Sequence, residues 1–245
     1  MVNALLFHNF NINNEIDYDP FYNINFEEYK ILLLNLSRKI ESNQYKITFD
    51  DGYQSIIPAI SFARSLGFET IAYIITSKIN KKGFLSDLEI FDLYSQGTTI
   101  GSHSHSHCNL TLLNDKKLEY ELKKSKEILM KITKNNIIDI SIPYGEKNKK
   151  IINFAKKHYI NIAISNPKYL ANNGYLSSNR IIGRLSIHRQ NIKNQNFILS
   201  ELKNKKNFLF IVKLLLTDLI KKIMPLSFFR FFKSLILLSK SINYF

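Results

Sequence analysis

The sequence predicts an α/β fold built on a parallel sheet, either open or closed into a barrel. Runs of β-prone residues alternate with helical patterns along the chain, which is typical of parallel α/β proteins. Hydrophobic residues make up 45% of the 245 residues, so the chain can bury a sizeable core. Polar clusters follow several predicted strands, at the sheet edge where such folds place their sites.

The first predicted elements follow from local patterns. Residues 4–7 form a short apolar run and predict a buried strand. Residues 26–40 place apolar side chains at helical spacing, with acids early and bases late, as the helix dipole favours. A β-prone run at 45–49 ends at Asp50-Asp51-Gly52, and residues 54–66 predict a helix with Gly67 as its C-cap.

The alternation continues to about residue 190 by the same patterns. The further predicted strands are 70–75, 98–100, 137–142, 160–164 and 181–187, and the further predicted helices are 85–94, 112–132 and 149–158. Gly97 ends the helix at 85–94, and Pro143 stops the strand at 137–142. The helix at 112–132 is long, amphipathic and rich in Glu and Lys.

The composition excludes several classes of protein. It is too apolar for a wholly disordered or collagen-like chain, and the single Cys108 cannot form an internal disulfide. The amino terminus lacks a basic leader with a long apolar run, and no stretch has about 18 uninterrupted apolar residues. We therefore expect a cytoplasmic protein, either free or at the inner face of the membrane.

Residues that could bind a metal ion cluster directly after two of the predicted strands. Asp50 and Asp51 follow one strand, and His103, His105 and His107 follow another. Imidazole and carboxylate groups suit Zn²⁺ or a similar divalent ion, and two His with one Asp leave a position open for water. One carboxylate of the pair would bind metal while its neighbour acts as general base. Alone, Asp-Asp-Gly is most often a turn and a single His pair is weak evidence, but the combination favours a metal site.

These motifs resemble those of the polysaccharide deacetylases, the NodB-homology family also called carbohydrate esterase family 4. Thr48-Phe49-Asp50-Asp51-Gly52 resembles the first family motif, and the segment from Gly101 to Leu110 resembles the second. Pro143-Tyr144-Gly145 resembles the third, and the order and spacing agree over about residues 1–190. The resemblance implies a distorted (β/α) barrel with fewer than eight repeats, which we place in residues 1–200.

The resemblance also implies a reaction and roles for particular residues. The reaction is metal-dependent hydrolysis of an N-acetyl group on a sugar. Asp50 would be the general base, and Asp51, His103 and His107 would hold the metal. The backbone N–H of Tyr144 would help to hold the developing oxyanion.

The sequence departs from the family pattern in its later motifs. The third motif often carries an Arg where this chain has Ser141, and Arg184 would supply that cation and pair with Asp50. The Asp of the fourth motif has no clear counterpart, although Asn166 lies near the expected place. His188 is the candidate for the general acid that the fifth motif supplies.

Residues 201–245 differ in kind from the rest of the chain. They contain nine Lys or Arg and two acidic residues, among many Phe, Leu and Ile. We predict a basic amphipathic helical tail that contacts a membrane surface, or else a helix that packs on the barrel or in a dimer. Basic residues that alternate with bulky aliphatic ones do not suggest nucleic acid. The oligomeric state is open.

Two further hypotheses remain beside the sugar deacetylase. The barrel would be a non-catalytic carbohydrate-binding or scaffold protein that retains the metal site, or a hydrolase of other C–N or ester bonds. For the deacetylase, the expected substrate is an N-acetylated sugar that is lipid-linked, nucleotide-linked or part of a polysaccharide.

Overall fold

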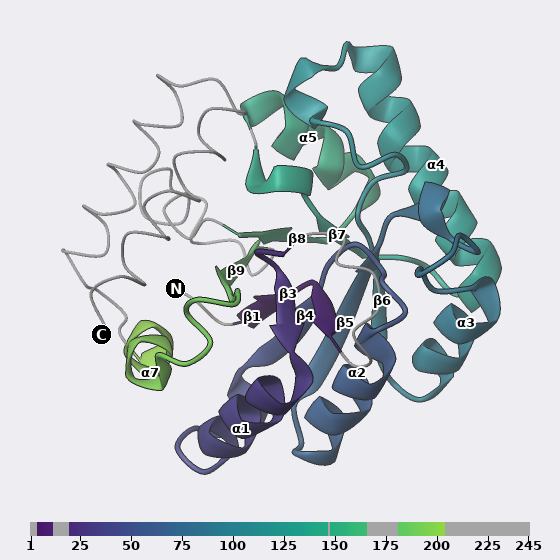
Figure 1. Cartoon of the computed structure of the whole chain (residues 1–245). Coiled ribbons are helices and arrows are strands. Elements are labelled where there is room, and N and C mark those ends of the chain that lie inside the picture. Colours follow the sequence, from purple (N-terminus) through teal and green to yellow (C-terminus); the bar gives the residue numbers. More distant parts are fainter. Residues whose placement is uncertain (1–3, 12–19, 147, 166–180, 204–245) are drawn as a thin grey trace. The chain divides into compact units, whose positions relative to one another are not determined.

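A closed barrel of seven parallel strands forms the centre of the protein (Figure 1). The computed structural model describes residues 4–11, 20–146, 148–165 and 181–203. The barrel strands, in the order in which they pair, are β1 (Ala4–Phe7), β4 (Lys46–Phe49), β5 (Glu69–Ile74), β6 (Thr99–Ser102), β7 (Asp139–Ser141), β8 (Asn161–Ile164) and β9 (Ile181–Ser186), and β9 closes onto β1. The predicted α/β class is confirmed, and the sheet is a barrel rather than open.

The barrel helices surround these strands in chain order (Figure 1). They are α1 (Phe26–Ser37), α2 (Ile56–Ser65), α3 (Asp87–Ser95), α4 (Asp115–Thr133) and α5 (Lys149–His158). All five were predicted, with ends shifted by up to three residues. Helix α4 starts later than predicted because Leu110–Leu112 form a separate 3₁₀ turn and the Asn114 side chain accepts from the Lys117 N–H, which caps the helix.

Alternation along the strands separates the barrel interior from the helix-covered exterior. On β4, Ile47 and Phe49 belong to the large core between barrel and helices, so Thr48 and Asp50 face the other way. On β9, Ile182 belongs to the small cluster inside the barrel, and Arg184 shares its face two residues later. The interior near the carboxyl ends of the strands is therefore polar.

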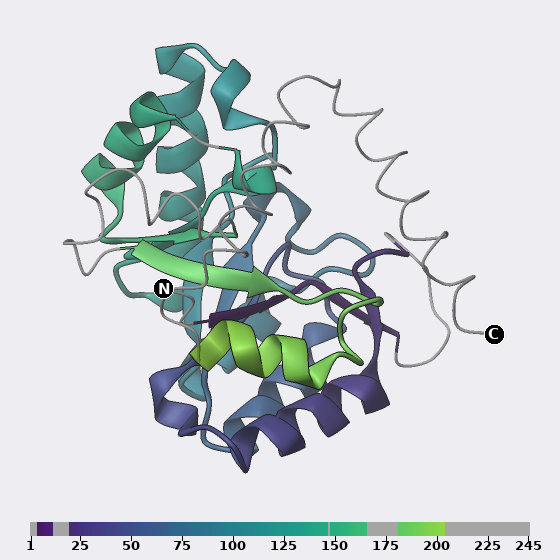
Figure 2. The same cartoon turned by 90° about the vertical axis from the view of Figure 1, so that its left-hand side faces the viewer.

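Three elements were not predicted. Two short strands, β2 (Asn9–Asn11) and β3 (Asn23–Asn25), pair with each other outside the barrel. Their Asn-rich sequences lack the apolar alternation by which strands are recognised. Helix α7 (Gln195–Lys203) lies beside α1 (Figure 2), where the Asn35 side chain donates to that of Gln195 at 3.0 Å.

Only the beginning of the predicted tail falls within the described residues. Helix α7 includes Glu201–Lys203, and residues 204–245 lie outside the described part. Within the described ranges, no helix combines the length and the hydrophobicity that crossing a membrane requires.

Candidate metal centre

The carboxyl ends of the barrel strands deliver the candidate residues to one rim. Asp50 and Asp51 directly follow β4, and His103 directly follows β6. Tyr144 follows β7 in a single 3₁₀ turn, Pro143–Gly145. Arg184 lies within β9 and faces the interior. Because all seven strands are parallel, segments distant in sequence meet at this end of the barrel.

Asp51, His103 and His107 form a compact set of metal donors. Their ligand atoms all lie within 4.8 Å of one another. The Asp51 Oδ1 atom is 3.4 Å from Nε2 of His103 and 3.4 Å from Nε2 of His107. Donors of one tetrahedral ion with bonds of about 2.0 to 2.1 Å lie about 3.3 to 3.4 Å apart, so the two distances from Asp51 to the imidazoles suit one divalent ion such as Zn²⁺.

The imidazole of His103 is fixed in the tautomer that a metal ligand needs. Its Nδ1 atom is 2.9 Å from the carbonyl oxygen of Ser141. A carbonyl oxygen only accepts, so Nδ1 carries the proton and Nε2 presents its lone pair toward Asp51 and His107. This buried hydrogen bond supports a metal-binding role over that of an ordinary core histidine.

Asp50 is held by a buried arginine that lies 134 residues later in the chain. Arg184 donates from Nη1 to Oδ1 at 2.6 Å and from Nη2 to Oδ2 at 2.9 Å. The Ser141 hydroxyl donates to Asp50 Oδ2 at 3.0 Å and accepts from Arg184 at 2.7 Å. The pair expected from the sequence is therefore formed, and the Ser141 hydroxyl is hydrogen-bonded to both of its members.

The environment keeps Asp50 ionised. Burial by itself would raise the pKa of this carboxyl group, but the charge of Arg184 and the hydrogen bonds that it donates hold the pKa well below its usual range. Asp50 Oδ2 also lies 3.6 Å from Nε2 of His103. A carboxylate that stays charged beside the metal donors can accept a hydrogen bond from a water molecule there.

Backbone strain is concentrated at this rim. Six non-glycine residues in the described ranges have a positive φ, and four of them belong to the site: Asp51, Ser104, His107 and Tyr144. L-residues adopt this conformation only where the surroundings enforce it. The local fold therefore holds Asp51 and His107 in strained backbone conformations, and the energetic cost must be offset by other contacts.

The other residues singled out from the sequence lie around the donor set or outside the described residues. The ring of Tyr144 lies 4.7 Å from that of His107. His188 follows β9 at the same end of the barrel, and its ring stacks on Phe21 at 4.3 Å. His105 is not in the donor set, and its Nδ1 lies 2.9 Å from the Thr76 hydroxyl. Asn166 lies outside the described residues.

Two further side chains lie next to this site: His8, which the sequence suggests is a packed residue at the barrel floor or rim and not a ligand, and Glu121, which sequence reasoning missed. His8 follows β1, and burial, only partly offset by Asp51 and Asp50, lowers its pKa, so its ring is largely neutral at pH 7. Glu121 lies on α4 and is 7% exposed. The signal for Glu121 was present, because it interrupts the apolar stripe that Leu118, Leu122 and Leu129 form on that helix.

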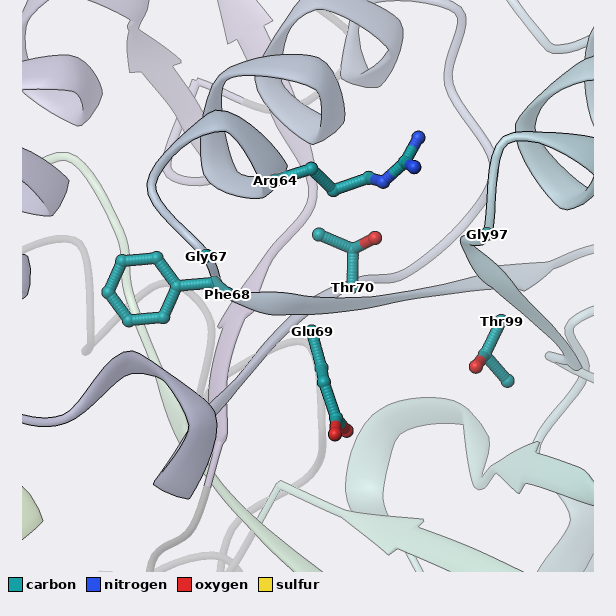
Figure 3. Close-up of a pocket in the computed structure, with 7 residues that line it drawn as sticks. All are labelled: Arg64, Gly67, Phe68, Glu69, Thr70, Gly97 and Thr99. Carbon is teal, nitrogen blue, oxygen red and sulfur yellow. The ribbon is translucent and has the colours of Figure 1, made fainter.

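A separate hollow of about 540 Å³ lies at the other end of the barrel, where β5 and β6 begin (Figure 3). Its lining residues are Arg64, Gly67, Phe68, Glu69, Thr70, Gly97 and Thr99. Figure 3 shows the Arg64 side chain extending over Thr70. The lining includes one carboxylate and no histidine, so it does not offer the donor set found at the opposite rim.

Comparison with known proteins is consistent with this geometry. The sequence model described as polysaccharide deacetylase matches residues 38–163, just over half of the chain. The Bacillus subtilis protein YxkH, whose name assigns it provisionally to the polysaccharide deacetylases, is 26% identical over 127 residues. That match covers 51% of this chain and 46% of YxkH, so this chain matches less than half the length of that relative.

Solved structures share the fold at low sequence identity. A polysaccharide deacetylase from Bacillus cereus is similar with a TM-score of 0.68 and 22% identity, over 82% of this chain and 69% of that one. A Streptococcus pyogenes deacetylase in complex with acetate gives a TM-score of 0.67 and 17% identity, over 83% of this chain and 98% of that one. At these identities the likeness establishes the barrel fold.

Proposed function

Because this chain belongs to the polysaccharide deacetylase family, we propose that it is a metal-dependent hydrolase that removes the acetyl group from an N-acetylated sugar. One observation carries the proposal. Asp51, His103 and His107 place three donor atoms within 4.8 Å of one another, beside the buried Asp50–Arg184 pair. A divalent ion held by these three residues would polarise the amide carbonyl and lower the pKa of a water molecule.

The chain's own residues would then complete the hydrolysis. Asp50 accepts a proton from the water whose oxygen attacks the carbonyl carbon. Arg184 and Ser141 hold the Asp50 carboxylate in place through their hydrogen bonds. The backbone N–H of Tyr144 donates to the oxygen that becomes negatively charged.

Loss of the amine completes the reaction. His188 donates a proton to the sugar nitrogen as the C–N bond breaks, and acetate and a free amino sugar result. The position of His188 just after β9, at the rim that carries Asp50 and His103, supports this assignment. The sugar is lipid-linked, nucleotide-linked or part of a polysaccharide, and its deacetylation serves surface-glycan metabolism.

Acetate release tests the proposed function directly. The purified chain is incubated with N-acetylated sugars of the three kinds, after metal removal by a chelator and again after Zn²⁺ is added back. We expect no release from the metal-free protein and restored release with Zn²⁺, because the water needs a cation to become nucleophilic near neutral pH. Zinc binding with no acetate release from any sugar would instead favour a non-catalytic carbohydrate-binding barrel.

For residues 201–245 we propose contact with an anionic membrane surface. The support is in the sequence, where nine Lys or Arg occur among many Phe, Leu and Ile. Basic side chains beside a wide apolar face attract anionic lipid and insert apolar groups at the interface.

Vesicle sedimentation tests the membrane contact. A chain that ends at Asn204 should lose binding to vesicles containing phosphatidylserine, because it lacks nearly all of the tail's basic and apolar residues. Vesicles of phosphatidylcholine alone are the control for the charge contribution. Equal binding by the shortened and the full chain would contradict the membrane contact.

A further inference from the structure

A buried carboxylate on α4 is bonded to the segment that joins the two metal-binding histidines. Glu121 Oε2 accepts from the backbone N–H of His105 at 2.9 Å and from that of Ser106 at 2.8 Å. Its Oε1 accepts from the Ser106 hydroxyl at 2.7 Å. All three donors belong to the two adjacent residues near the middle of the His103–His107 segment.

The burial of Glu121 shows that this contact is specific. A carboxylate that is 7% exposed is costly unless donors satisfy it, and these three donors do so. An apolar residue at this place on the stripe of α4 would pack without that requirement. Helix α4 therefore carries one carboxylate in its buried stripe, at the point where the helix packs against the segment from His103 to His107, called the histidine segment below.

The histidine segment is held from a second side as well. The Ser77 N–H donates to the His105 carbonyl at 2.9 Å, and the Thr76 hydroxyl lies 2.9 Å from His105 Nδ1. His105 is thus fixed between the 3₁₀ turn Thr76–Lys78 and helix α4. On either side of His105 and Ser106, Ser104 and His107 adopt strained positive φ values of 62° and 59°.

From these contacts we propose that Glu121 is a positioning residue for the metal site: it fixes the backbone between His103 and His107, so that both imidazoles meet Asp51 at the required spacing. This inference rests on the proposed function only in assuming that the donor set binds a metal. Partners of this kind, which orient the ligands without touching the ion, typically change metal affinity 10- to 100-fold when they are replaced. Glu121 acts through geometry, and its negative charge is not required.

Three substitutions separate geometry from charge. Glu121→Gln keeps the length, and its amide oxygen can accept both backbone N–H groups while its amide nitrogen donates to Ser106. Glu121→Asp keeps the charge but is one methylene shorter, so it cannot reach the same three donors. Glu121→Leu keeps the apolar packing and removes every acceptor. Glu127→Gln is the matched control, because Glu127 is 51% exposed on the same helix.

The measurements are the Zn²⁺ dissociation constant of the full chain, by competition with a chelator, and the visible spectrum of the Co²⁺-loaded protein. We expect Gln at residue 121 and the Glu127 control to stay within about threefold of the parent protein. We expect Asp and Leu to weaken Zn²⁺ binding by about 10- to 100-fold and to change the Co²⁺ spectrum. Circular dichroism and the melting temperature without metal show whether each variant is folded.

Several results would overturn the inference. Equal Zn²⁺ affinity for all variants would show that Glu121 does not position the metal ligands. Weak Zn²⁺ binding by Glu121→Gln together with normal binding by Glu121→Asp would show that the charge of Glu121, and not its length, is decisive. If the Leu variant does not fold, the comparison of Gln with Asp still decides between these outcomes. If the parent protein itself binds no Zn²⁺, the proposed function fails first, and this failure is distinct from that of the Glu121 inference.

Discussion

Replacing Asp50 by Asn should lower the rate of acetate release by about 10²- to 10⁴-fold, the range that general-base catalysis supplies. The amide cannot accept the proton of the attacking water near neutral pH. Zinc affinity should change little, because the three donors are Asp51, His103 and His107. Measurement of acetate release and bound zinc on the same preparation checks both statements.

Stability has to be controlled in this experiment. Asn at residue 50 leaves the fully buried Arg184 guanidinium without its counter-charge, so the single variant loses stability as well as activity. The double variant Asp50→Asn/Arg184→Met removes both charges and should fold better while remaining inactive. Acetate release by Asp50→Asn at the parent rate would rule out Asp50 as the base.

Replacing Arg184 alone by Met should destabilise the fold by about 3 to 5 kcal/mol, because removal of one partner of a buried ion pair leaves the other charge uncompensated. Arg184 is 0% exposed, pairs with Asp50 through both Nη atoms and lies 5.2 Å from the centre of the Tyr73 ring. For a chain of this size the loss corresponds to a fall of about 6 to 20 °C in melting temperature.

A double-mutant cycle distinguishes loss of the ion pair from loss of packing. If the pair dominates, Asp50→Asn/Arg184→Met is more stable than Arg184→Met, because no charge remains buried alone. Urea unfolding of the four proteins gives the coupling energy. Strictly additive losses would show that Arg184 contributes by filling the barrel interior and not through Asp50.

Local pattern was enough to predict the twelve main barrel elements. Runs of β-prone residues ended by Gly, Pro or a polar cluster marked each strand, and helical spacing marked each helix from α1 to α5. The short strands β2 and β3 were missed because three-residue Asn-rich segments have no such pattern. Helix α7 was missed because it spans residue 200, where the change in composition was taken as the end of the barrel domain.

The sequence by itself determined which chemistry the rim offers. Two adjacent carboxylates, Asp50 and Asp51, follow β4, and two imidazoles four residues apart, His103 and His107, follow β6. The tertiary structure decided the rest. The Asp50–Arg184 pair, which the family resemblance led us to expect, joins residues 134 positions apart. Closure of the barrel between β9 and β1 forms it by bringing β9 to the side of the sheet that carries β4. The barrel also places the Ser141 hydroxyl, on β7, within hydrogen-bond distance of both residues, and the packing of α4 brings Glu121 to the His103–His107 segment. Contacts between distant segments depend on how the strands pair and how the helices pack, and no local pattern encodes either.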